Sequence, residues 1–141
     1  MSETRRPPRL LIFGEPAWFM SAILTEAALR LAREQGLEVV GFCDAGPRPH
    51  RRAPVIAREL LATALKRAFT ADHPIHLRSI VCPDVRTIAR RFGVPVLVPP
   101  ERNVNDPRFV ARVANELRPD WGLSLASGQI FGRDLLAAVG R

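Results

Sequence analysis

The sequence has 141 residues and a mass of 15.7 kDa, which is room for one domain with an ordinary hydrophobic core and little more. Hydrophobic residues make up 47% and charged residues 25%, a composition that excludes a largely disordered chain. The longest apolar run is far shorter than the ~20 residues of a membrane span, and no apolar segment typical of a secretory signal follows the first residues. Two cysteines cannot form a disulfide framework, so we expect a protein of the reducing cytoplasm with no membrane partner.

Basic residues outnumber acidic residues by 21 to 14, which gives a formal net charge of +7. The basic residues are spread along the expected helices and do not form one block. Such an excess has two interpretations: solvated helix faces, or attraction to a polyanionic partner. Charge alone does not decide between them.

The chain begins with a strand, a helix and a second strand. Residues 1–8 contain two adjacent prolines and are expected to form a disordered arm. Residues 9–13 (RLLIF) form a continuous apolar run, typical of a central parallel strand covered on both faces. Apolar steps of three and four predict a helix over 19–34, which ends before Gly36. Residues 37–43 (LEVVGFC) are expected to form the next strand.

The middle of the chain is the part least clearly patterned. Residues 44–54 are rich in proline and arginine and predict a loop. Helical periodicity predicts a helix over 55–69. Residues 71–83 contain two prolines and a short apolar piece, 79–82, that suits a small strand.

The last third alternates between helices and strands. Asp106 is a favourable N-cap, and Pro107 suits the first helical position because its missing amide hydrogen costs nothing there. Pro119 marks the end of the same helix. The expected elements are helices at 84–92, 107–117 and 132–139, strands at 94–98 and 120–126, and a turn at 127–131.

Four strands that alternate with helices predict an α/β fold with an open, mostly parallel sheet and helices on both faces. Such sheets bind ligands at the carboxyl ends of their strands. The segment Gly14-Glu15-Pro16 follows the first strand but lacks the three-glycine spacing of a dinucleotide site. It is therefore either a turn that faces a substrate or a plain strand-to-helix turn.

Metal-ligand patterns are weak. The candidate soft ligands are Cys43, His50, His73, His76 and Cys82, but Pro74 separates the two neighbouring histidines and no CxxC or HExxH sequence accompanies them. We expect no metal, and we expect the isolated thiols to be small buried hydrophobic groups.

Two segments resemble a known family. The opening RLLIFGEPAWFMSAI is similar to the first strand and Gly-x-Pro-x-Phe turn of the folate-dependent formyltransferases, and residues 93–140 resemble the family's order of strand, Pro loop, helix, strand, turn and helix. Arg118-Pro119-Asp120 and Gly128-Gln129-Ile130 are the most specific matches. The resemblance extends from residue 10 to 140, is loosest over 53–81, and implies a Rossmann-like sheet of the formyltransferase N-terminal domain type.

The resemblance implies that the chain uses 10-formyltetrahydrofolate, the family's formyl donor, as a cosubstrate. The turn after the fourth strand would hold the pterin ring through Ala126, Ser127, Gly128, Gln129, Ile130 and Phe131. A glycine there lets the backbone approach a flat heterocycle, although Ser127 stands where family members carry an aromatic residue. The alternative is that this turn only connects a strand to a helix. If the Gly14-Glu15-Pro16 turn faces a substrate, Gly14 borders that substrate.

The branch of the family most similar to this sequence formylates methionyl-tRNA in translation initiation. By that resemblance Arg48, Arg51 and Arg52 contact phosphates of the tRNA acceptor stem, since guanidinium groups bind phosphate in pairs of charge-assisted hydrogen bonds. The alternatives are the amine of an amino sugar or small metabolite as acceptor, and a non-catalytic remnant that binds folate or a nucleotide.

The family's catalytic Asn-x-His segment and its later aspartate do not occur in the 141 residues, so no catalytic residue is assigned. We therefore expect residues 9–141 to be an incomplete formyltransferase N-terminal domain that is inactive alone. The strand at 120–126 would leave an unpaired sheet edge, which favours self-association.

Overall fold

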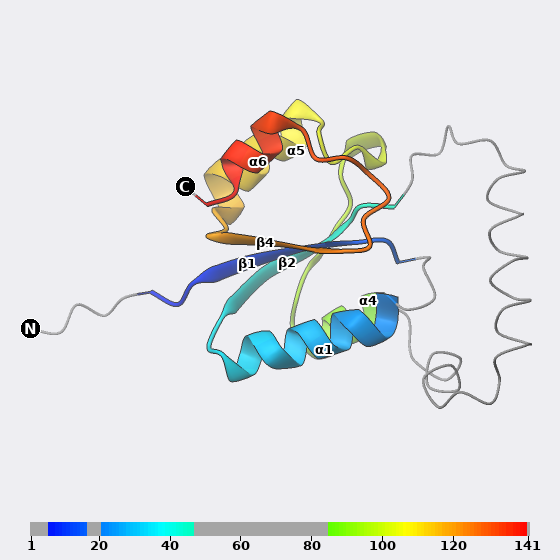
Figure 1. Ribbon diagram of the computed structural model, residues 1–141, viewed down its shortest axis with the longest axis vertical. Helices are drawn as coiled ribbons and strands as arrows, with labels where there is room; N and C mark the ends of the chain where they lie inside the picture. Colours follow the sequence, from blue (N-terminus) through cyan, green and yellow to red (C-terminus); the bar gives the residue numbers. More distant parts are fainter. Residues whose placement is uncertain (1–5, 17–20, 47–84, 141) are drawn as a thin grey trace, which may run out of the picture.

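The computed structural model describes residues 6–16, 21–46 and 85–140. Within these residues, four parallel strands form one sheet in the order β3-β2-β1-β4 (Figure 1). The strands are β1 (Arg9–Gly14), β2 (Glu38–Asp44), β3 (Val96–Leu97) and β4 (Trp121–Leu125). The predicted open, parallel, Rossmann-like α/β sheet is confirmed.

Helices cover both faces of this sheet, as Figure 1 shows. On one face lie α1 (Ser21–Glu34) and α4 (Val85–Arg91). On the other lie α5 (Pro107–Arg112), its continuation η2 (Val113–Leu117) and α6 (Arg133–Ala138). This arrangement of layers explains why the central strands are largely apolar.

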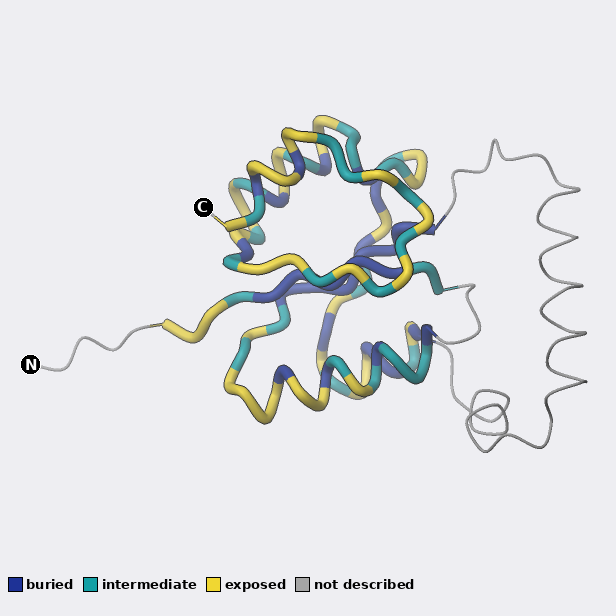
Figure 2. The backbone as a smooth tube through the Cα atoms, viewed as in Figure 1, coloured by how far each residue is buried: buried dark blue, intermediate teal, exposed yellow. Residues whose placement is uncertain are grey.

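The central strand β1 is buried on both sides, as its continuous apolar sequence predicts (Figure 2). Leu10 and Ile12 belong to the hydrophobic cluster under α1 and α4, whereas Leu11 and Phe13 belong to the cluster under α5 and α6. Successive side chains of a strand point to opposite faces, so this one strand contributes to both cores.

The helix predicted at 107–117 changes its winding in its last turn. Its N-cap is the expected one, because the Asp106 side chain accepts a hydrogen bond from the Arg108 amide at 2.9 Å. The helix is α-helical only as far as Arg112 and then π-helical, with the Arg118 amide donating to the Val113 carbonyl at 2.8 Å. Arg118 then adopts a left-handed conformation, φ 42°, which ends the helix.

The strand predicted at 94–98 is shorter in the structure. Only Val96 and Leu97 pair with β2. Pro95 has no amide hydrogen to give to the ladder, although its carbonyl accepts from the Phe42 amide at 2.9 Å. Pro99 follows closely on the other side, so the two prolines confine the strand to the residues between them.

Within the described part of the chain, β4 lies at the edge of the sheet and pairs with β1 alone. Asp120, directly before β4, forms hydrogen bonds to the start of β1 and to the residues before it. Its Oδ2 accepts from the Arg9 amide at 2.8 Å, and its Oδ1 accepts from the Arg6 guanidinium at 3.1 Å. The Pro8 carbonyl accepts from the Glu38 amide at 2.9 Å. Arg6 and Pro8, from the predicted arm, thus contact the start of the sheet.

Some expectations fall outside the described residues: the helix at 55–69 and the small strand at 79–82. In the segments that are described, no helix is both long and apolar enough to traverse a bilayer.

Candidate functional site

The carboxyl ends of β1, β2 and β4 meet at one edge of the sheet. Gly14 pairs in register with Asp44 of β2 and with Leu125 of β4. Directly after β2, the Ala45 amide donates to the Gly14 carbonyl at 2.8 Å. The turns that follow these strands are therefore neighbours, which is the geometry that parallel sheets use for ligand binding.

The predicted folate-binding turn, residues 126–131, lies at this edge. Ala126, Gly128 and Ile130 are exposed, while the residues between them are half-buried. The Ile130 side chain is 90% exposed, although it is large and apolar. Ala126 has φ 51°, a left-handed conformation that a residue with a side chain adopts only when its surroundings hold it there.

Hydrogen bonds join this turn to the loop after β2. The Gly128 amide donates to the Ala45 carbonyl at 3.1 Å. The Gln129 side-chain nitrogen donates to the Gly46 carbonyl at 2.6 Å. Ser127 holds the turn internally, since its hydroxyl oxygen accepts from the Gln129 amide at 3.3 Å. The structure thus brings the turn after β4 against the ends of β1 and β2.

The loop after β3 contacts the same turn. Gln129 also donates to the Arg102 carbonyl, at 2.6 Å, and accepts from the Val104 amide at 3.1 Å. The Asn105 side chain donates to the Ile130 carbonyl at 2.8 Å and accepts from the Gly132 amide at 2.6 Å. Three loops therefore form one hydrogen-bonded corner.

Phe131 differs in position from the rest of the predicted turn. Its ring lies 4.8 Å from the ring of Phe13, centroid to centroid, and it packs on the core under α6. A hollow of about 130 Å³ adjoins it, lined also by Gly122, Ser124, Leu135, Leu136 and Val139. This hollow is smaller than the several hundred Å³ typical of ligand pockets.

Gly14 is buried, and its surroundings explain the requirement for glycine. A Cβ atom there would lie 2.8 Å from Cζ of Phe42 and 3.3 Å from the Leu125 carbonyl oxygen. The predicted tRNA-binding residues Arg48, Arg51 and Arg52 lie outside the described residues.

The thiol of Cys43 is fully buried in β2, in line with the hydrophobic role expected for it. Burial, with a smaller effect of the neighbouring Asp44, raises the pKa of this thiol far above its usual value, so the thiol stays protonated. The other candidate metal ligands, His50, His73, His76 and Cys82, lie outside the described residues. Among the residues that are described, no group of three metal-ligating side chains occurs.

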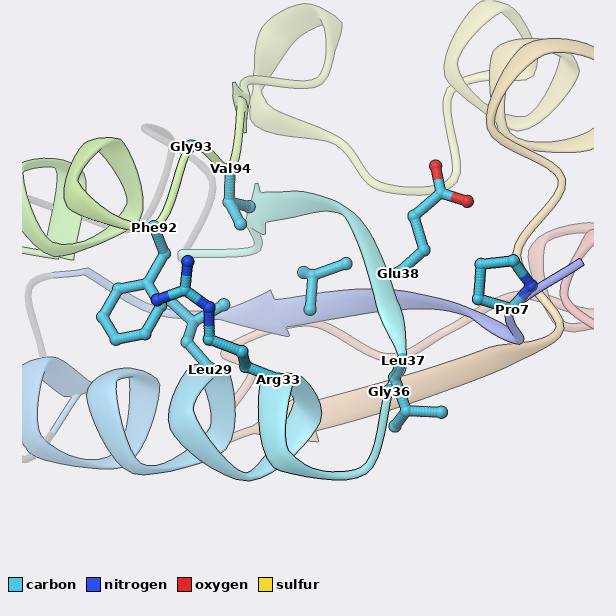
Figure 3. A pocket seen from close by; sticks show the side chains of 10 residues that line it. Pro7, Leu29, Arg33, Gly36, Leu37, Glu38, Phe92, Gly93 and Val94 are labelled. Carbon is cyan, nitrogen blue, oxygen red and sulfur yellow. The ribbon is translucent and has the colours of Figure 1, made fainter.

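A separate hollow of about 350 Å³ lies near the amino end of β2, between the end of α1 and the turn before β3 (Figure 3). The Arg33 guanidinium carbon lies 5.9 Å from the centre of the Phe92 ring at its border. The described residues that line it include Leu29, Leu37 and Val94, and none of the predicted folate residues. This hollow is therefore distinct from the corner at the carboxyl ends.

Sequence reasoning did not identify two residues of the corner. Asn105 fixes one end of the turn, and the Asp44 side chain accepts from the Gly46 amide at 3.1 Å and shapes the loop after β2. Both are short polar residues: Asp44 directly follows the predicted strand at 37–43, and Asn105 directly precedes the predicted N-cap Asp106. Such residues hydrogen-bond nearby backbone, but the sequence does not reveal which distant loop they contact.

Comparison with known proteins supports the family resemblance. The chain is 33% identical over 131 residues to the methionyl-tRNA formyltransferase of Roseiflexus sp. (strain RS-1), a match that covers 93% of this chain and 30% of that protein. It is 46% identical over 57 residues to the methionyl-tRNA formyltransferase of Roseiflexus castenholzii, covering 40% of this chain and 17% of that protein. The chain thus spans about a third or less of each relative's length.

No family model and no solved structure gives a significant match. The family resemblance therefore rests on the long alignment to the Roseiflexus sp. protein and on a sheet of the expected architecture. On these grounds the chain resembles the N-terminal domain of the formyltransferase family over nearly all of its length.

Proposed function

We propose that the corner at the carboxyl ends of the strands binds 10-formyltetrahydrofolate, and that the protein takes part in transferring the formyl group to an amine. The observation that carries this proposal is the hydrogen bond from the Gly128 amide to the Ala45 carbonyl, 3.1 Å long. It holds the turn after β4 against the ends of the two central strands, where ligands of parallel sheets bind. Formyl transfer is proposed as the reaction because both relatives are named formyltransferases.

The chemistry of the corner suits a flat heterocycle. Such a ring needs apolar contact on its faces and backbone hydrogen-bonding groups at its edge. Ile130 offers apolar contact because its side chain is 90% exposed, and Val98, directly after β3, is 52% exposed. Ala126 and Gly128, in the same turn as Ile130, present exposed backbone. We infer that these residues hold the pterin ring, while the folate supplies the formyl group.

We further propose methionyl-tRNA as the formyl acceptor. Both relatives are methionyl-tRNA formyltransferases, and the net charge of +7 suits a polyanion. Arg48, Arg51 and Arg52 belong to the segment 44–54 predicted as a loop, and they would contact phosphate. Replacing all three with serine is expected to weaken binding of methionyl-tRNA in a filter-binding assay. Equal binding by the wild-type and triple variants would contradict this assignment.

The 141 residues contain no Asn-x-His sequence, the segment to which the family resemblance assigns catalysis. We therefore propose that this segment alone binds the formyl donor without transferring its formyl group. Formyl transfer above background by the purified 141-residue chain would refute this part of the proposal.

A titration with 5-formyltetrahydrofolate, a stable isomer of the donor, tests the binding site by calorimetry. We expect saturable binding that Ile130→Glu weakens about tenfold or more, a loss of about 1.4 kcal/mol. Leu31→Glu is the matched control, because Leu31 is also an exposed apolar side chain, 57% accessible, but lies on α1. Absence of saturable binding, or equal effects of the two substitutions, would overturn the proposal.

A further inference from the structure

Gln129 lies in the turn after β4, but its side chain contacts the backbone of two other loops. Its Nε2 donates to the carbonyls of Gly46 and Arg102, each at 2.6 Å, and its Oε1 accepts from the Val104 amide at 3.1 Å. Both amide hydrogens and one acceptor site of the side chain are thus used within the protein. Little of the side chain remains to contact a ligand.

We propose that Gln129 is a positioning residue: it fixes three loops to one another so that the folate corner exists before the ligand arrives. The inference rests on the proposed function for the identity of the ligand. It differs from the expectation that Gln129 itself binds folate, because here the side chain acts only through the loops that it joins.

Backbone strain in two of these loops supports this role. Glu101 and Arg102 have φ of 50° and 51°, and Ala126 has φ of 51°, all in the left-handed region that disfavours residues with a side chain. Such conformations persist only where the surrounding structure holds them. Gln129 hydrogen-bonds the carbonyl of Arg102 itself. The loop conformations on either side of the corner are therefore expected to depend on the Gln129 side chain.

Other hydrogen bonds hold the two ends of the turn, and the Gln129 side chain holds its middle. At one end the Gly128 amide donates to the Ala45 carbonyl. At the other, Asn105 donates to the Ile130 carbonyl and accepts from the Gly132 amide. Between these ends, the Gln129 side chain supplies the contacts to the neighbouring loops. Loss of the Gln129 side chain is therefore expected to make the middle of the turn mobile, while the hydrogen bonds at its ends still hold it to the neighbouring segments.

Two substitutions separate a positioning role from a merely structural one. Gln129→Leu removes every hydrogen bond of the side chain at all pH values. Gln129→Glu keeps the shape, but its carboxylate cannot donate to the carbonyls of Gly46 and Arg102. Because these oxygens and partial burial disfavour the charge, the pKa of Glu at this position should lie above its usual ~4.3. Protonation would then restore one donor. Gln35→Glu, at an exposed position after α1, is the matched control.

Binding of 5-formyltetrahydrofolate is measured by calorimetry from pH 8 to pH 5. If Gln129→Leu leaves about one tenth of molecules with the corner formed, apparent affinity falls about tenfold at every pH. Gln129→Glu should bind weakly at pH 8 and approach the wild-type protein at pH 5, while Gln35→Glu should match the wild-type protein throughout. Unchanged binding by Gln129→Leu would overturn the proposal, as would a Gln129→Glu deficit that does not vary with pH.

Amide hydrogen exchange provides a readout that needs no ligand. Gln129→Leu should accelerate exchange of the Val104 amide, which loses its acceptor, and leave unchanged the Arg118 amide, bonded to Val113 at 2.8 Å. Suppose that the Val104 amide exchanges faster in Gln129→Leu but the wild-type protein binds no folate. This result would refute the proposed function and still support the conclusion that Gln129 fixes the loops to one another. If the Val104 and Arg118 amides instead exchange faster by the same factor, in both Gln129→Leu and Gln129→Glu, the substitutions destabilise the whole fold. That result would overturn the positioning role.

Discussion

Gly14 at the end of β1 lies directly against the Phe42 ring of β2: a Cβ atom at Gly14 would approach Cζ of that ring to 2.8 Å. Phe42 is fully buried, and side chains in protein cores are closely packed, so moving this ring would disturb its neighbours. The contact joins the two central strands at the edge where the candidate site lies. It also gives a structural reason for glycine at the last position of β1.

Gly14→Ala is therefore expected to lower the free energy of unfolding by about 1–3 kcal/mol, as overpacking of a dense core does. Urea denaturation measures the loss. Phe42→Leu makes room for the added methyl group, so Gly14→Ala should cost less in that background than in the wild-type protein. The same cost in both backgrounds would show that the Phe42 ring is not the obstacle.

Asp120 provides a second test of the sheet, at its opposite end. Asp120→Ala leaves the Arg9 amide without its 2.8 Å acceptor and should lower the free energy of unfolding by about 1–3 kcal/mol. Asp120→Asn keeps an oxygen that accepts from this amide and should cost less. Equal losses for the two variants in urea denaturation would contradict the importance of the acceptor.

The N-cap of α5 predicts a pH dependence of stability. The side-chain hydrogen bond from Arg108 lowers the pKa of Asp106 below its usual value of 3.8, with further lowering by backbone amides and by the guanidinium charge. A lowered folded-state pKa means that the ionised carboxylate stabilises the fold above the unfolded-state pKa. This contribution is lost as the pH falls through the folded-state value.

Asp106→Ala should therefore be less stable than the wild-type protein at pH 7, and the difference should shrink as the pH falls below about 3.8. Asp106→Asn retains a capping oxygen and should stay close to the wild-type protein at neutral pH. Urea denaturation at pH 7 and at pH 3 measures both. A difference between wild type and Asp106→Ala that does not vary with pH would contradict this prediction.

The exposed edge of β4 predicts self-association of the 141-residue chain. Trp121 on this strand is 64% exposed, and within the described residues one edge of β4 has no neighbouring strand, which favours pairing with another copy. Trp121→Lys should shift sedimentation velocity profiles toward the monomer at equal concentration. Leu31→Lys, on α1, should not. A wild-type chain that stays monomeric at all accessible concentrations would contradict the prediction.

The strands and helices of the described residues were largely predictable because their signals are local. The apolar run of β1 and the Asp106-Pro107 cap each depend on neighbouring residues in the sequence, and both appear as expected. The short β3 and the π-helical turn of η2 were not predicted. Prolines around β3 limit its pairing, and the winding of η2 depends on how its residues pack on the sheet.

The candidate site was predictable only in its location. The order of strands places the turn at 126–131 at the carboxyl edge, but nothing in the sequence indicates that Gln129 contacts Gly46 and Arg102. Those contacts join residues 83 and 27 positions apart, and they form only when the sheet brings three loops together. The contact of the Phe131 ring with the Phe13 ring, which lies far away in the sequence, was likewise not predicted.

Mapping of 5-formyltetrahydrofolate on the chain by NMR tests the central claim most directly. We predict that backbone amide signals of residues 126–131, Ala45 and Gly46 shift during the titration, while those of Leu37 and Val94 at the amino-end hollow stay fixed. Signals that shift at that hollow instead, or no shift at saturating ligand, would contradict a folate site at the carboxyl ends of the strands.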